Sequence, residues 1–181
     1  SSRVRPMMLF QDIWRSMVRK NKKFKKSGVG KAKCAFQIAV ENTPDVKNGF
    51  CVGLKAVKNS DRNKVDATDP KKIQGSLDID GQVKKIYPDK NRWDYALSYD
   101  DKIYFFEVHS ASTSDVDTVI KKLTWLKEWL KNKAPQINKL QKGNQPYTWV
   151  QTDGYAILSS GSYAKKLSTH GIAVANRLKL E

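Results

Sequence analysis

Residues 92–111 read RWDYALSYDDKIYFFEVHSA, and this stretch decides the fold predicted for the chain. Over residues 92–99 large aromatic and aliphatic side chains alternate with smaller or polar ones, which is the period of a β-strand. The pair Asp100-Asp101 is typical of a tight turn, and residues 102–109 return to aromatic and β-branched side chains. The stretch therefore predicts a β-hairpin with a two-residue loop.

The length of this turn determines which residues face each other across the hairpin. If Tyr99 pairs with Lys102, Asp94 lies directly opposite Glu107, with the Cβ atoms about 5 Å apart. Two carboxylates at that separation repel and raise each other's pKa, so they are tolerated mainly when a cation or a shared proton compensates. Asp94 and Glu107 are therefore a candidate site. A loop one residue longer or shorter would turn the two side chains to different faces.

The chain has 181 residues, which are enough for one hydrophobic core with an appended arm. Its charge is distributed unevenly along the sequence. The net charge of +16 favours polyanionic partners such as nucleic acid. Residues 1–33 hold eleven basic residues against one acid, a net of +10. We expect a basic helix and linker at 1–33 and a single domain at 34–181. The linker is either solvated or contacts phosphates through Arg19, Lys20, Lys22, Lys23, Lys25 and Lys26.

The sequence favours a soluble protein of a reducing, cytoplasmic compartment. Cys34 and Cys51 lie far apart without a CxxC motif, so neither a disulfide framework nor a zinc site is predicted. There is no run of 18 apolar residues and no apolar stretch typical of a signal peptide at the start, so no membrane partner is expected.

The elements on either side of the hairpin are also readable. After the hairpin, Ser114 and Asp117 have capping-box spacing and precede an apolar helical stripe. Trp125 and Trp129 on this helix either pack in the core or stack on bases. A strand is expected at 147–151, a helix at 163–169 and a last strand at 172–180. Before the hairpin, the acids at 78 and 80 either share a strand face as ligands or follow a Ser76 helix cap.

This order of elements, with Asp on one hairpin strand and Glu-x-His on the next, resembles the PD-(D/E)XK restriction-endonuclease-like superfamily over residues 50–152. The resemblance implies an α+β fold with an αβββαβ core, in which helices flank a mixed sheet. The segments GSLDIDG, NRWDYAL, FFEVHSAS and KKLTWLKEWL also resemble small bacterial proteins of unassigned function, which implies no activity.

The superfamily resemblance implies a metal site. Asp94 and Glu107 match the two carboxylates that hold Mg²⁺ or Mn²⁺ at a scissile phosphate, and the Val108 carbonyl would be the third ligand. A hard divalent ion prefers such oxygen ligands. The literal Pro88-Asp89 pair precedes the strand, whereas Asp94 lies within it, so Asp94 is the preferred match.

One position departs from the motif, because His109 stands two residues after Glu107, where the superfamily has Lys. An imidazole can orient water or stabilise the transition state, but it is largely neutral near pH 7. The alternative is a hydrogen-bonded histidine at a strand end. In this superfamily the lysine can move to a neighbouring element, which makes Lys122 in the following helix the first replacement and Lys121 the second.

The resulting functional hypothesis is a metal-dependent nuclease that cleaves DNA or RNA, with Asp94, Glu107, His109 and Lys122 as catalytic residues. One alternative is a nucleic-acid-binding module without catalysis. Another is a protein-interaction domain whose basic arm meets an acidic partner. The oligomeric state stays open, with a homodimer among the options.

Overall fold

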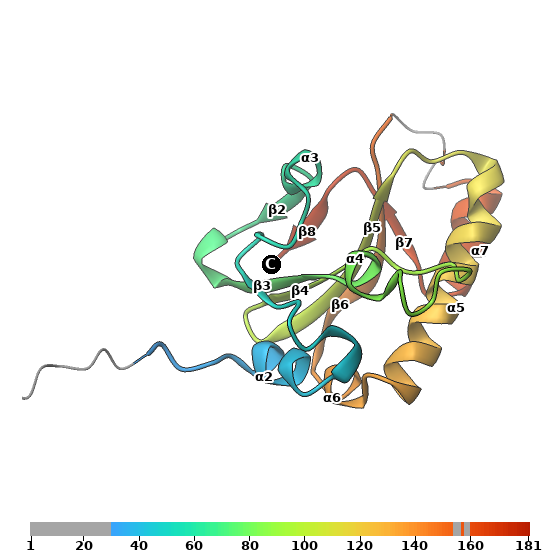
Figure 1. The fold of residues 1–181 in the computed structure, drawn as a ribbon. Helices are drawn as coiled ribbons and strands as arrows, with labels where there is room; N and C mark the ends of the chain where they lie inside the picture. The colour runs from blue at the N-terminus through green and yellow to red at the C-terminus, as the bar shows by residue number, and fades with distance from the viewer. Residues whose placement is uncertain (1–29, 154–156, 158–159) are drawn as a thin grey trace, which may run out of the picture. The chain divides into compact units, whose positions relative to one another are not determined.

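The computed structural model describes residues 30–153, 157 and 160–181 (Figure 1). The chain divides into two compact units, residues 1–32 and 33–181, and only residues 30–32 of the first are described. The predicted phosphate-contacting side chains between Arg19 and Lys26 therefore lie outside the described residues. The following description concerns the second unit. Over the described ranges, no helix is long and apolar enough to cross a membrane.

The second unit is an α+β structure built on a mixed six-stranded sheet, as the sequence predicted. The strand order is β1-β3-β4-β5-β6-β7, with antiparallel pairs from β1 to β5 and parallel pairs from β5 to β7. A second, two-stranded parallel sheet pairs β2 with β8. The strands are β1 (Cys51–Val52), β2 (Val65–Ala67), β3 (Ile73–Asp78), β4 (Tyr95–Tyr99), β5 (Lys102–His109), β6 (Lys142–Gln151), β7 (Ala173–Ala175) and β8 (Leu178–Leu180).

The β4–β5 hairpin has the predicted loop and register. Tyr99 pairs with Lys102, and the loop residues Asp100 and Asp101 have φ angles of 48° and 62°. Positive φ at both central positions is the geometry of the tight turn that matches the twist of a hairpin. Extending the ladder beyond the pair of Tyr95 with Phe106 places Asp94 opposite Glu107, so the predicted register is confirmed.

Three main helices are α2 (Ala35–Glu41), α5 (Val116–Asn132) and α7 (Ser162–Thr169), and the shorter ones are α3 (Asn59–Arg62), α4 (Ile79–Val83) and α6 (Pro135–Asn138). Helix α5 connects β5 to β6, because two parallel strands need a crossover connection. It begins after a capping box formed by Ser112 and Asp115 around a 3-10 turn, two residues before the predicted pair. Gly171 follows α7 with φ of 82°, as predicted for a helix C-terminus.

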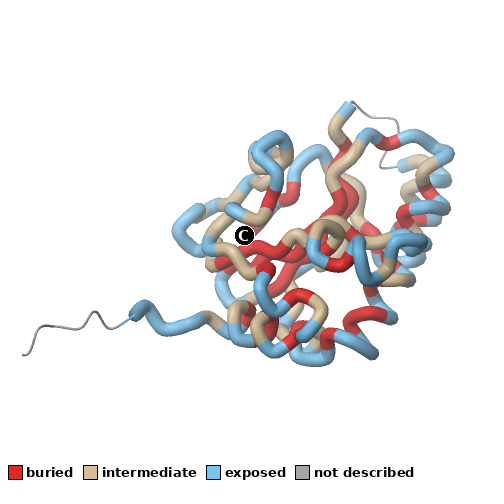
Figure 2. The backbone as a smooth tube through the Cα atoms, viewed as in Figure 1, coloured by how far each residue is buried: buried red, intermediate tan, exposed pale blue. Residues whose placement is uncertain are grey.

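Each face of the main sheet is buried, which Figure 2 shows as a band of buried backbone through the central strands. On one face Phe105 and Trp149 join a core with the helices, and α5 contributes the buried Leu126 and Trp129. On the other face Phe106 and its neighbours pack against β8. Since strand side chains alternate, Glu107 lies on the same face as Phe105, which is the face that α5 covers.

Two elements near the hairpin differ from the sequence prediction. Residues 75–78 belong to strand β3, and the cap of the following helix is Asp78, not Ser76. Strand β6 begins at Lys142, five residues before the expected start, because its ladder with β5 continues past an irregularity. Gln145 has a φ of 48° there, which lets the strand pass Pro146 and resume pairing.

Candidate active site

The carboxylates of Asp94 and Glu107 lie together where β4 begins and β5 ends. The backbone N–H of Asp94 donates to Glu107 Oε1 at 2.8 Å. The backbone N–H of Val108 donates to Asp94 Oδ2 at 3.1 Å. Each strand therefore holds the carboxylate of the other through a main-chain donor, which fixes both side chains on the helix-covered face.

The ammonium of Lys122 bridges the two acids. Lys122 Nζ lies 2.6 Å from Glu107 Oε2 and 3.5 Å from Asp94 Oδ1. The capped turn after β5 brings the first turns of α5 over this end of the sheet, with Val119 and Leu123 buried beside Lys122. Lys121, the second candidate from the sequence, is exposed. The structure thus brings together the two predicted carboxylates and the first of the predicted lysines.

The burial of this cluster sets its electrostatics. The Glu107 side chain is 0% exposed. Burial first, and then the charge of Asp94, hold the pKa of Glu107 well above its ordinary value, although Lys122 offsets part of the rise. Burial lowers the pKa of Lys122, but the charges of Glu107 and Asp94 outweigh that effect and raise it. Lys122 is therefore a stable ammonium held between two acids.

His109 lies at the edge of the cluster. Its Nε2 is 3.7 Å from Glu107 Oε2, which is too long for a hydrogen bond. Its Nδ1 lies 2.7 Å from the Ser110 carbonyl oxygen, and since a carbonyl only accepts, Nδ1 is the donor there. The ring packs against Trp149 with 5.0 Å between ring centres. The hydrogen-bonded strand-end histidine expected as the alternative is therefore present, next to the carboxylates.

Asp78 and Asp80 have structural partners. Asp78 Oδ1 accepts the N–H of Gly81 at 2.8 Å as the cap of α4, and burial raises the pKa of Asp78. Asp80 Oδ1 pairs with Arg92 Nε at 2.7 Å. Over the part of the chain that the structure describes, no group of three or more His, Cys, Asp or Glu side chains is placed to hold a metal. A metal would thus depend on Asp94, Glu107 and non-side-chain ligands.

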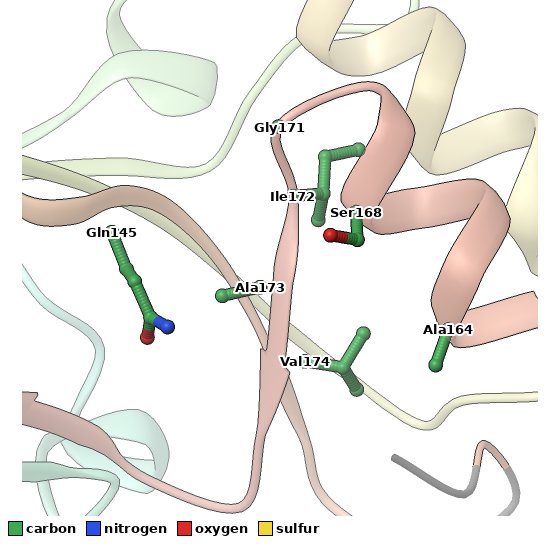
Figure 3. Close-up of a pocket in the computed structure, with 7 residues that line it drawn as sticks. All are labelled: Gln145, Ala164, Ser168, Gly171, Ile172, Ala173 and Val174. Carbon is green, nitrogen blue, oxygen red and sulfur yellow. The ribbon is translucent and has the colours of Figure 1, made fainter. Parts of the chain in front are cut away.

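A surface pocket lies away from this cluster, between α7 and β7 (Figure 3). Its lining includes Ala164 and Ser168 from α7, Ala173 and Val174 from β7, and Gln145 from β6. The lining holds no carboxylate, histidine, cysteine or lysine, so the pocket offers no side-chain acid or base, and the candidate chemistry stays with the carboxylate cluster.

Sequence reasoning missed Arg92. Its Nη1 donates to the carbonyl oxygens of Tyr87, Pro88 and Lys90 at 2.7, 2.9 and 3.2 Å, while its Nε binds Asp80. The signal available was a lone arginine after the turn sequence Pro-Asp-Lys-Asn, directly before the strand. One guanidinium closes the loop that leads to the candidate site.

Comparison with known proteins adds no assignment for this site. No protein-family model matches the chain, and no curated protein or solved structure matches it either. The functional argument therefore rests on the geometry and chemistry of the chain itself.

Proposed function

We propose that the chain is a metal-dependent nuclease of PD-(D/E)XK type that hydrolyses phosphodiester bonds of DNA or RNA. The observation that carries the proposal is the Lys122 ammonium between the carboxylates of Asp94 and Glu107. The order of elements supports it, since an antiparallel β3-β4-β5 meander is followed by α5 and the parallel strand β6. This succession is similar to the βββαβ part of the order that the resemblance implies, with the short helix α4 inserted between β3 and β4.

The residues present are suited to a hard divalent ion. Asp94 and Glu107 supply carboxylate oxygens, and the Val108 carbonyl is the predicted third ligand. Mg²⁺ commonly uses one or two protein carboxylates and takes its other ligands from water and substrate phosphate, so two acids suffice. When bound, such an ion lowers the pKa of an attacking water and neutralises charge on the phosphate.

The side chains around the proposed metal site have separate roles. Asp94 and Glu107 are oriented by main-chain N–H groups, so their oxygens stay in place without side-chain rearrangement. Lys122 balances their charge in the free protein, and its flexible stem can redirect the ammonium to a substrate phosphate oxygen. It would thereby replace the lysine that the motif lacks at His109. His109 lies near enough to orient a water molecule.

The test is cleavage by the full chain. Plasmid, single-stranded DNA and RNA are incubated with Mg²⁺, with Mn²⁺ or with EDTA, beside the Glu107→Gln variant. We expect cleavage that needs the ion and is lost in the variant, while the circular dichroism spectrum and unfolding midpoint show an intact fold. Cleavage in EDTA, or no cleavage with either ion, would refute the proposal.

The second candidate is a nucleic-acid-binding module without catalysis. The observation that favours it is that Lys122 already compensates both acids, so the cluster is stable without a metal. Binding that weakens with salt, but is indifferent to metal and to Glu107→Gln, would select this candidate.

A further inference from the structure

The loop of residues 84–92, between α4 and β4, presents positive charge beside the candidate site. Lys84, Lys85 and Lys90 are exposed, and none of them forms an ion pair with a residue that the structure describes. Ile86 is 50% exposed, which is unusual for a large apolar side chain in this chain. The loop thus offers three exposed lysines against one exposed acid, Asp89, together with one apolar contact.

The loop is held in one conformation, although it is at the surface. Arg92 Nη1 binds three of its carbonyl oxygens, and Arg92 Nε is fixed in turn by Asp80 at 2.7 Å. Those carbonyls would otherwise bind water. A preorganised loop loses less conformational entropy when it binds a partner, so its lysines can contribute more to affinity than lysines on a flexible segment.

Two anchors connect the loop to the strand and the helix that carry the carboxylate cluster. Arg92 comes two residues before Asp94 in the chain. The Tyr87 ring packs edge-on against Trp125, with 5.9 Å between ring centres. Trp125 follows Lys122 by three residues on α5, about 4.5 Å along the helix axis. The loop is therefore held by the segment that leads into Asp94 and by the helix that carries Lys122.

We propose that residues 84–92 form the nucleic-acid contact surface of the candidate site, with Lys84, Lys85 and Lys90 on phosphates and Ile86 on a sugar or base. The inference rests on the proposed function, since it assigns the substrate contact of the same site. Phosphate is the expected partner because a lysine that neutralises a phosphate releases the counterions condensed on the nucleic acid, and this release favours binding. An apolar side chain between such lysines contributes contact with the less polar parts of the strand.

The experiment measures binding of a labelled single-stranded DNA oligonucleotide to the full chain, in EDTA so that cleavage does not interfere. The variant Lys84→Gln/Lys85→Gln/Lys90→Gln should lower the slope of log affinity against log salt by about 2, at about 0.7 per lost phosphate contact. The control Lys131→Gln/Lys133→Gln/Lys139→Gln removes the same charge at and beyond the end of α5. It should change the slope by less than about 1.

Two single variants test the contributions to binding that do not depend on the charge of the lysines. Arg92→Lys keeps the charge but loses the fork that binds three carbonyls, and Ile86→Ser loses the apolar contact. Both should weaken binding and leave the salt slope nearly unchanged. Equal slopes for the two triple variants would overturn the inference, because charge anywhere on the unit would then suffice.

The outcomes keep this inference distinct from the nuclease proposal. If the loop variant loses binding but the chain cleaves nothing, only the nuclease proposal fails. If the chain cleaves while the loop variant binds like the unsubstituted chain, only the assignment of the loop fails.

Discussion

Two polar clusters lie along helix α5, and the acids in them have different partners. Near the start of the helix Lys122 lies between Asp94 and Glu107. Seven residues later, two helical turns on, Trp129 Nε1 donates to Asp45 Oδ2 at 3.0 Å, and the Tyr87 hydroxyl donates to the same oxygen at 2.6 Å. The second cluster thus holds one acid with two neutral donors.

The difference indicates which cluster is structural. Neutral donors satisfy Asp45 without bringing a second charge out of water, and burial together with the Asp45 contact raises the pKa of Tyr87 to about 12, so the donor stays protonated. At the other cluster the ammonium of Lys122 lies between the fully buried Glu107 and the partly exposed Asp94. Burying charge is costly when stability is the only benefit. The proposed function would account for this charged arrangement at Glu107, whereas Asp45 needs no such account.

The largest expected effect comes from Glu107→Gln. This change keeps the shape of the side chain and removes a buried charge, so we expect cleavage to fall at least about 10³-fold, the scale of losing a major electrostatic contributor. The free energy of unfolding should fall, because Gln removes the carboxylate that pairs with the Lys122 ammonium at 2.6 Å and leaves that ammonium to Asp94 alone at 3.5 Å. Initial cleavage rates and urea unfolding measure the two quantities. Asp45→Asn, which keeps an acceptor oxygen, is the control and should retain most of the activity.

Lys122→Met tests the charge balance directly. Removing the cation leaves Asp94 and Glu107 facing each other uncompensated, so the free energy of unfolding in EDTA should fall by about 3 kcal/mol. Mn²⁺ should restore part of that loss, because an ion that binds only the folded state stabilises it. Urea unfolding with and without Mn²⁺ makes the measurement. If the variant is as stable in EDTA as the unsubstituted chain, Lys122 does not stabilise the fold by compensating the two acids.

Asp45→Ala should have a smaller effect that no metal reverses. It leaves the Trp129 indole N–H and the Tyr87 hydroxyl without their acceptor, which should lower the free energy of unfolding by about 2 kcal/mol. Because Asp45 lies away from the proposed metal site, Mn²⁺ should stabilise the variant and the unsubstituted chain by the same amount, so the difference between them should stay. The same urea titrations serve as the measurement, and a difference that shrinks in Mn²⁺ would contradict the assignment of this cluster as structural.

Much of the candidate site could be predicted because its geometry is local. The alternation of residues 92–109 and the Asp100-Asp101 pair determine the register, and the register alone places Asp94 beside Glu107. Lys122 follows Glu107 by fifteen residues through one capped turn, and the resemblance to the superfamily named it as the replacement for the motif lysine. The register itself needed only short-range rules of turns and strand periodicity.

The parts that were missed depend on contacts between distant residues. A helix cap was correctly predicted near residue 78, but the capping residue is Asp78 and not Ser76. Residues 75–78 pair with β4, and this pairing extends strand β3 as far as the cap. Residues 172–180 were predicted as one strand, yet Leu178 pairs with Val65 in a separate sheet. The Arg92 clamp is closer in sequence, and the turn before it was visible, but its acceptors are main-chain carbonyls whose positions only the folded loop defines.

The smallest expected effect on the cleavage rate is that of His109→Ala. Its comparison with Lys122→Met shows which of the two side chains contributes more to cleavage. The imidazole is occupied by the Ser110 carbonyl through Nδ1 and by packing on Trp149, and it does not bind Glu107. We therefore expect cleavage to fall less than about tenfold, below the range of a positioned general acid or base. Rates at saturating Mn²⁺ for His109→Ala and Lys122→Met, measured side by side, decide the matter. If His109→Ala is the more damaging change, the imidazole moves the proton, and Lys122 has only a structural role, as Trp129 and Tyr87 have at Asp45.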